Sequence, residues 1–279
     1  MSATSVGAAG HARRTVLDLP GQPIAALQSG PADGPPVLLV PGYTGSKEDF
    51  GPILDPLGDV GFRVTAIDLP GQFESPGPSA VDGYTPDRLG AVVGAVGARL
   101  GGPVRLLGHS FGGLVARAAV IGGPEHFESL VLLCSGPAEL GGGRRTTMDG
   151  LEPVLAASGV PGLYRAMQVA AEADPAYVVP PPEVAEFQQM RFLTGSPAML
   201  QGMADSLRGE PDRVAELAAT GVPVLVAHGV DDDAWPLAEQ KDMAQRLGGR
   251  YEVIPAAAHS PAVENPAATI ALLTKFWRS

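Results

Sequence analysis

The sequence has only one cysteine, an excess of acidic over basic residues, and no long hydrophobic run. With Cys134 as its only cysteine, the 279-residue chain cannot hold a disulfide framework. Nineteen basic residues against 30 acidic ones give a net charge of -11, which disfavours binding to nucleic acids and anionic membranes, since both require a basic surface. No window reaches the roughly 18 apolar residues of a membrane-spanning helix. These features predict a protein with neither a nucleic-acid partner nor a membrane-inserted segment.

The N-terminal segment MSATSVGAAGHARR also lacks the apolar stretch of about 7–15 residues found in a secretory signal. We therefore expect residues 1–14 to form a flexible tail and the protein to be cytoplasmic. Cys134 lies in SLVLLCSG, which is typical of the end of a buried strand, and we expect its thiol to pack in the core.

What the sequence does have is a series of short, almost continuous Val, Leu and Ile runs. They span residues 15–19, 23–28, 36–40, 63–69, 104–108, 129–134, 222–229 and 251–256. Runs of this kind are typical of parallel strands covered on both faces. Segments of helical length lie between them at 86–100, 111–121, 234–247 and 266–277. The pattern predicts an α/β fold: a doubly wound, mostly parallel eight-stranded sheet with flanking helices. The tripeptide PGQ between the first two runs predicts an antiparallel hairpin at one edge.

A stretch without strand signals interrupts this alternation. We interpret residues 137–217 as an inserted helical cap and residues 15–136 together with 218–279 as the core domain. The insert holds five of the seven methionines: Met148, Met167, Met190, Met199 and Met203. Methionine suits an adaptable apolar pocket, but it equally suits packing of the cap on the sheet, and both interpretations stay open.

The sequence Gly108-His109-Ser110-Phe111-Gly112 joins a predicted strand to a predicted helix. The pattern G-x-S-x-G indicates a sharp turn that presents a serine hydroxyl at the functional edge of the sheet. The alternative is a turn with an ordinary helix-capping serine. A serine nucleophile needs a base, and His259 is the best candidate because it follows the last strand on a loop that returns to this edge. His228 falls inside a strand end, and we interpret it as a structural residue.

A carboxylate that orients the histidine is available in HGVDDDAWP after the penultimate predicted strand. It offers Asp231, Asp232 and Asp233, and spacing from the other motifs does not choose among them. A solvated acidic turn is the alternative.

Together, GHSFGG, GVDDDAWP and AHSPAVENP resemble the α/β-hydrolase superfamily, over the chain from about Val16 to Trp277. The resemblance implies a catalytic triad of Ser110, Asp232 and His259, because the family acid lies three residues after the glycine and four before the proline. It also implies an oxyanion hole formed by the backbone N–H groups of Tyr43 and Phe111.

Two loops depart from the family pattern. Pro41 stands where the family often has histidine, so the loop that carries Tyr43 must be held in another way. In DLPGQFES, Gln72 and Phe73 replace the usual pair of residues. We interpret this loop as structural, and the alternative is that Gln72 touches substrate.

The resemblance is greatest to small esterases, thioesterases and cofactor-free haloperoxidase-type proteins. It implies a serine hydrolase that cleaves a carboxylic ester or thioester through an acyl-enzyme, with no cofactor and no metal. Alternatives are acyl transfer, cofactor-free lyase or perhydrolase chemistry on the same triad, or a non-catalytic ligand-binding protein. We expect an apolar small-molecule acyl substrate. The residues expected to contact it are Gly42, His109, Trp235, Met167 and Met190.

Overall fold

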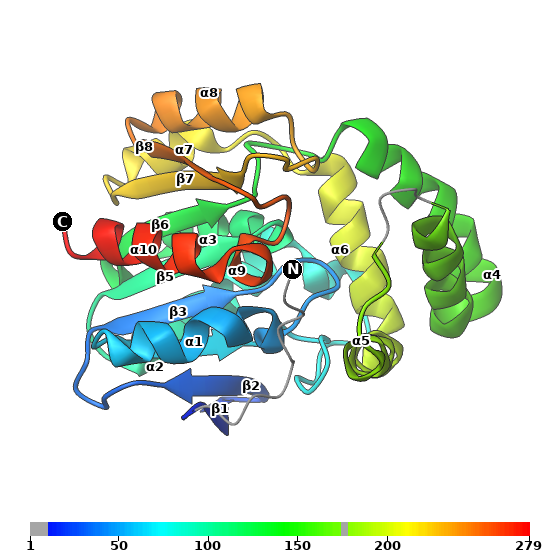
Figure 1. The fold of residues 1–279 in the computed structure, drawn as a ribbon, viewed down its shortest axis with the longest axis horizontal. Helices are drawn as coiled ribbons and strands as arrows, with labels where there is room; N and C mark the ends of the chain where they lie inside the picture. The colour runs from blue at the N-terminus through cyan, green and yellow to red at the C-terminus, as the bar shows by residue number, and fades with distance from the viewer. Residues whose placement is uncertain (1–10, 174–177) are drawn as a thin grey trace.

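The computed structural model describes residues 11–173 and 178–279, and its strands form one sheet (Figure 1). They are β1 (Arg13–Leu19), β2 (Gln22–Ser29), β3 (Pro36–Val40), β4 (Arg63–Ile67), β5 (Val104–His109), β6 (Phe127–Leu133), β7 (Val224–Gly229) and β8 (Arg250–Ile254). Their spatial order is β1-β2-β4-β3-β5-β6-β7-β8. Strand β2 is antiparallel to both β1 and β4, and all the other pairs are parallel. The predicted fold class and edge hairpin are confirmed.

Helices cover both faces of this sheet. They are α1 (Gly51–Asp59), α2 (Pro86–Leu100), α3 (Phe111–Gly122), α7 (Val214–Ala219), α8 (Leu237–Leu247), α9 (Pro261–Glu264) and α10 (Pro266–Trp277), with 3₁₀ turns at Lys47–Phe50, Val81–Tyr84 and Pro124–His126. Helices α1 and α10 pack on one face, and α2, α3 and α8 on the other (Figure 1). Every residue of β7 is buried, as its unbroken apolar run predicts for a strand covered on both sides.

Helix α1 is not among the predicted helices. Its sequence GPILDPLGD contains two prolines and two glycines, which usually mark a loop. Pro52 lies in the first turn, where its missing N–H costs nothing. Ile53, Leu54 and Leu57 are all buried, so packing against the sheet compensates for poor helix propensity.

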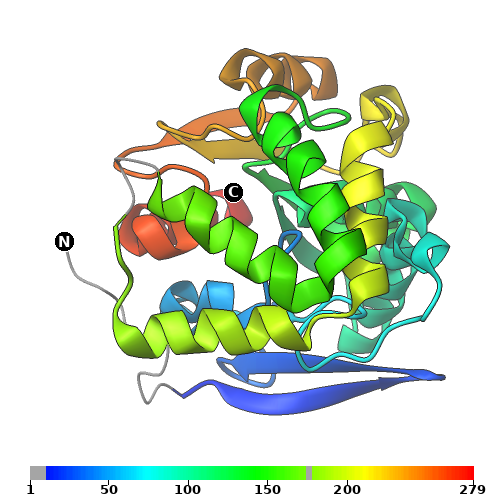
Figure 2. The ribbon, with the colours of Figure 1, turned by 90° about the vertical axis from the view of Figure 1, so that its right-hand side faces the viewer.

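Three further helices lie beyond the carboxyl ends of the parallel strands (Figures 1 and 2). They are α4 (Gly142–Glu172), α5 (Pro182–Thr194) and α6 (Pro197–Gly209), and we call them the cap. Helix α4 is kinked at Gly159, whose φ of 62° falls in the region that favours glycine. Helix α7, which spans the predicted end of the insertion at residue 217, packs against α3 and α8 instead of over the strand ends.

Both ends of the segment that bears the cap are attached to the same buried arginine. Arg117 on α3 donates to Glu210 Oε1 at 2.6 Å and to the carbonyl of Pro137. The Arg117 side chain is 1% exposed, and a buried charge of this kind is tolerated only when paired. The pair therefore holds the start and the end of the insertion together.

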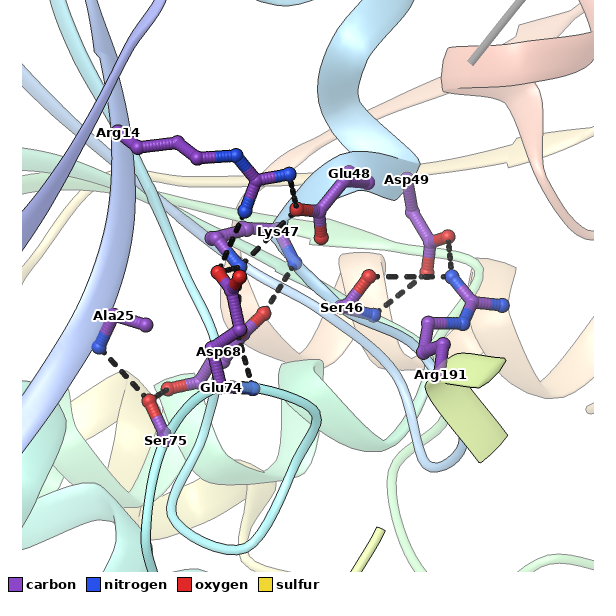
Figure 3. A network of polar contacts seen from close by, with 10 residues as sticks. All are labelled: Arg14, Ala25, Ser46, Lys47, Glu48, Asp49, Asp68, Glu74, Ser75 and Arg191. Atoms are coloured by element: carbon purple, nitrogen blue, oxygen red, sulfur yellow. Dashed lines mark hydrogen bonds and ion pairs between the residues drawn. The ribbon is translucent and has the colours of Figure 1, made fainter. Parts of the chain in front are cut away.

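The chain enters the sheet at Arg13, so the last two residues of the predicted tail belong to β1. Residues 1–10 of that tail lie outside the described part of the chain. Arg14 forms ion pairs with Glu48 at 3.1 Å and Glu74 at 2.6 Å (Figure 3). None of the described helices is long and apolar enough to cross a membrane.

Candidate active site

Ser110 occupies the turn between β5 and α3. Its backbone has φ 56° and ψ -123°, a conformation that costs a non-glycine residue free energy and is found chiefly at functional sites. The Ser110 N–H donates to the Leu133 carbonyl at 2.9 Å, which holds the turn in place. A Cβ on Gly112 would collide with the carbonyl oxygen of Pro41, so the close approach of the two loops requires glycine there.

His259 lies between the serine and an aspartate. Its Nε2 is 3.0 Å from Ser110 Oγ, and its Nδ1 is 2.7 Å from Asp232 Oδ1. Because a carboxylate only accepts hydrogen bonds, Nδ1–H is the donor, which leaves Nε2 free to accept the serine proton. The structure thus brings the three residues of the predicted triad into contact in the order that acyl chemistry requires.

The three consecutive aspartates differ in their exposure to solvent. Asp232 is 7% exposed, whereas Asp231 and Asp233 are both exposed. Gln240 donates to Asp232 Oδ2 at 2.9 Å, and the Ala234 N–H donates to Oδ1 at 3.2 Å. Burial by itself would raise the pKa of Asp232, but the hydrogen bonds and the charge of His259 outweigh it and hold this pKa below its ordinary value.

The backbone N–H groups predicted to form the oxyanion hole belong to Phe111, which follows Ser110 in the chain, and to Tyr43, which follows Gly42. Neither has a hydrogen-bond acceptor among the residues that the structure describes. Gly42 lies against Ser110, so a Cβ there would be 3.2 Å from the serine Cβ. The Tyr43 hydroxyl donates to the Leu200 carbonyl at 2.8 Å and so connects this loop to α6 of the cap. Two free donors beside a serine oxygen suit a developing negative charge.

His109 supports the loop that carries His259. Its Nε2 lies 2.6 Å from the His259 carbonyl, which can only accept, so Nε2 carries the proton. Burial and the neighbouring imidazole of His259 lower the pKa of His109 to about 4. The ring is therefore neutral in the folded protein throughout the range in which a free histidine titrates.

The low pKa of His109 predicts an acid-dependent loss of stability. Between about pH 6.5 and 4 the unfolded chain binds a proton at this residue and the folded chain does not, so stability falls as pH falls. His109→Gln is expected to remove about 2 kcal/mol of this dependence, allowing for the solvent that still reaches the ring. Chemical denaturation of both proteins at pH 7.5, 5.5 and 4 measures the difference. The prediction is wrong if the free energy of unfolding depends on pH in the same way in both proteins.

A cavity of about 750 Å³ opens in front of Ser110 beneath the cap. Apolar side chains from α4 and α6 line one part of it: Met148, Leu151, Leu155, Leu163, Met167, Leu200, Ala204 and Leu207. Of the predicted substrate contacts, Gly42, His109, Trp235 and Met167 line this cavity. Met190 does not, and its side chain is 48% exposed on α5. Met199 and Met203 instead pack in the core. Of the cap methionines, Met148 and Met167 therefore line the cavity, whereas Met199 and Met203 pack in the core.

The charged side chains at the cavity are mostly paired with one another. Arg191 on α5 pairs with Asp49, which also accepts from the Ser46 N–H (Figure 3). Two further pairs join Arg144 to Asp233 at 2.6 Å and Arg208 to Glu152 at 3.2 Å. These three pairs offer the cavity little net charge.

A buried lysine connects the loop after β4 to the turn after Tyr43 (Figure 3). Lys47 Nζ is 2.7 Å from Asp68 Oδ2, and Asp68 Oδ1 accepts from the Lys47 N–H at 2.8 Å. Ser75 donates to the Asp68 carbonyl at 2.9 Å and accepts from the Ala25 N–H. These contacts agree with a structural role for DLPGQFES.

His109, Cys134 and His259 place potential metal-ligand atoms within 4.8 Å of one another. However, both ring nitrogens of His259 are already hydrogen-bonded, one to Asp232 and the other to Ser110. Cys134 is fully buried, and this burial raises the pKa of its thiol. A metal here would have to displace the contacts of the predicted triad. The absence of a metal stays a prediction.

Two glutamines of this site were not identified as supports from the sequence. Gln240 fixes Asp232, and Gln72 is 1% exposed and donates to the Gly42 carbonyl at 2.7 Å. A buried amide leaves no motif in a sequence, since glutamine is common on exposed helix faces. The only sequence signal for either glutamine was that Gln72 replaces the usual family residue.

His228, predicted to be structural, is buried, and its Nε2 forms a hydrogen bond with the Tyr251 hydroxyl at 2.7 Å.

An eight-stranded, doubly wound sheet with a serine at the turn after its fifth strand places this protein in the class of α/β-hydrolase folds. The model of the Alpha/beta hydrolase family matches residues 37–272, and the chain belongs to this family.

Relatives and solved structures agree with that family. "Putative carbamate hydrolase RutD" of Variovorax paradoxus is 32% identical over 229 residues, which cover 78% of this chain and 82% of the relative. A pimeloyl-[acyl-carrier protein] methyl ester esterase of Neisseria meningitidis is 28% identical over 86% of this chain and 76% of its own length. A carboxylesterase structure from Nitrososphaera gargenis has a TM-score of 0.79 at 20% identity, covering 95% and 98% of the two chains. That likeness shows the shared fold.

Proposed function

We propose that this protein is a serine hydrolase that cleaves a carboxylic ester or thioester through an acyl-enzyme. The observation that supports this most directly is the contact of His259 with both Ser110 and Asp232 at the base of a cavity. Relatives named for carbamate and methyl ester hydrolysis support the cleavage of a bond to a carbonyl carbon.

In the proposed reaction, Ser110 Oγ attacks the carbonyl carbon while His259 Nε2 takes the hydroxyl proton. Asp232 keeps the proton on Nδ1 and stabilises the imidazolium that forms. The negative oxygen of the tetrahedral intermediate accepts hydrogen bonds from the N–H groups of Tyr43 and Phe111. His259 then gives its proton to the leaving oxygen or sulfur as the bond to the carbonyl carbon breaks. Water, deprotonated by the same imidazole, releases the acid and restores Ser110.

The position of His259 orients the substrate in the cavity. The leaving group must lie on the His259 side, near residues 258–264, because it receives its proton from Nε2. The acyl chain then extends toward the apolar part between α4 and α6. Since Arg191, Arg144 and Arg208 are already paired with carboxylates, we propose an uncharged, apolar acyl group.

The function is tested by a panel of p-nitrophenyl esters and matched thioesters of increasing chain length, with labelling by a fluorophosphonate. Hydrolysis together with a single adduct on Ser110 supports the proposal. Product analysis with added alcohol, amine and hydrogen peroxide separates hydrolysis from acyl transfer and perhydrolysis. A folded protein that neither hydrolyses any member nor reacts with the probe would refute a serine hydrolase.

Two methionines of the cap provide a matched test of the acyl pocket. Met167→Trp is expected to shorten the preferred acyl chain, because Met167 lines the cavity, whereas Met190→Trp is expected to leave it unchanged. Each buried methylene is worth about 0.8 kcal/mol, or about fourfold in kcat/KM, until the pocket is full. The chain length of maximal kcat/KM in each variant is the measurement. The same shift in both variants would show that the acyl chain does not lie against α4.

A further inference from the structure

The loop that carries Tyr43 is held by a side chain from another loop. Pro41 supplies no polar side chain there, and Gln72 reaches across from the turn after β4. Its Nε2 donates to the Gly42 carbonyl at 2.7 Å and lies 3.3 Å from the Tyr43 carbonyl. Its Oε1 accepts from the Leu69 N–H at 2.9 Å, so both ends of the amide are engaged. Because this side chain is only 1% exposed, water does not compete for its hydrogen bonds.

The contact with the Gly42 carbonyl bears directly on the Tyr43 N–H. Both groups belong to the same peptide unit, which is planar and trans, so they point in opposite directions. An anchor on the carbonyl therefore fixes the direction of the N–H. A hydrogen bond to the oxygen also polarises the unit and makes its N–H a stronger donor. The Gly45 N–H reaches the same carbonyl at 3.2 Å, but it belongs to the same loop and cannot fix that loop to the core.

We propose that Gln72 positions the oxyanion hole by aiming the Tyr43 N–H at the space in front of Ser110. This inference rests on the proposed function. Gln72 does not line the large cavity, so it acts through the Gly42–Tyr43 peptide and not on substrate. It is a positioning residue whose contribution arises as negative charge develops on the reacting oxygen.

The test compares Gln72→Glu and Gln72→Met with the wild-type protein. Glutamate keeps an acceptor for the Leu69 N–H but replaces the donor to Gly42 by a carboxylate, and methionine keeps the approximate shape without either hydrogen bond. Gln28→Met is the matched control, because Gln28 donates to Thr65 at 3.1 Å on a strand remote from this loop. A fluorophosphonate probe suits the measurement, since the oxygen on its phosphorus develops charge where the substrate oxyanion would.

The maximal labelling rate of both Gln72 variants is expected to fall about 10–100-fold, somewhat less than the loss of a whole donor. The concentration of probe that gives half this rate should change less than about threefold, because ground-state binding is untouched. The midpoint of the pH–rate profile should stay where it is in wild type, since His259 and Asp232 keep their contacts. Thermal melts identify any variant that fails to fold.

The outcomes separate this inference from the proposed function. Wild-type protein that does not react at Ser110 overturns both. Normal labelling of wild type with unchanged rates in folded Gln72→Glu and Gln72→Met overturns the positioning role alone. A rate loss no larger than that of Gln28→Met, or a loss accompanied by a shifted pH midpoint, also overturns it, because general loosening of the site would then explain the effect.

Discussion

Ser110→Ala is expected to lower ester turnover by about 10⁴–10⁶-fold, because the proposed acyl-enzyme cannot form without the hydroxyl. The fold should survive, since the removed oxygen forms a hydrogen bond with His259 and with no other described residue. Turnover of the preferred p-nitrophenyl ester and the mass of the fluorophosphonate adduct are the measurements.

Ser135→Ala is the matched control for this substitution. Ser135 is a fully buried serine near the same turn, and its hydroxyl has no hydrogen-bond partner in the described part of the chain. Its removal should leave turnover within about threefold of wild type. Undiminished activity of folded Ser110→Ala would show that another group performs the attack.

Asp232→Asn is expected to lower kcat by about 10³–10⁴-fold with little change in KM. Asparagine fits the same space, but its NH₂ can donate to Nδ1 of His259. The proton of the imidazole would then reside on Nε2, where the base must be free. Steady-state kinetics, together with a thermal melt of the variant, measure this loss.

The neighbouring aspartates serve as controls with the same change of charge. Asp231 and Asp233 are exposed. Among the residues of known placement, Asp233 pairs only with Arg144, whose side chain is 40% exposed. Asp231→Asn and Asp233→Asn should therefore change kcat by less than about threefold, since exposed ion pairs contribute little. Equal losses in all three variants would mean that the negative charge of the turn matters and not the contact of Asp232 with His259.

Sequence reasoning succeeded where a local pattern has one structural solution. The G-x-S-x-G turn and the continuous apolar strands have few alternatives, so the fold class and the position of Ser110 could be predicted. It failed for α1, where buried Ile53, Leu54 and Leu57 outweigh the proline and glycine signals. It also grouped Met167 with Met190, although only Met167 faces the cavity, because composition does not tell which side of a cap helix points inward.

By itself the sequence determined the eight strands, the right-handed α/β arrangement and the order of Ser110, Asp232 and His259 along the chain, since these depend on local hydrophobic pattern and turn chemistry. Tertiary structure alone decided the contacts between these residues, the apolar cavity beneath the cap, and the support of the Tyr43 loop by Gln72. Those features join residues 27 to 149 positions apart, and their geometry depends on how whole helices and loops pack.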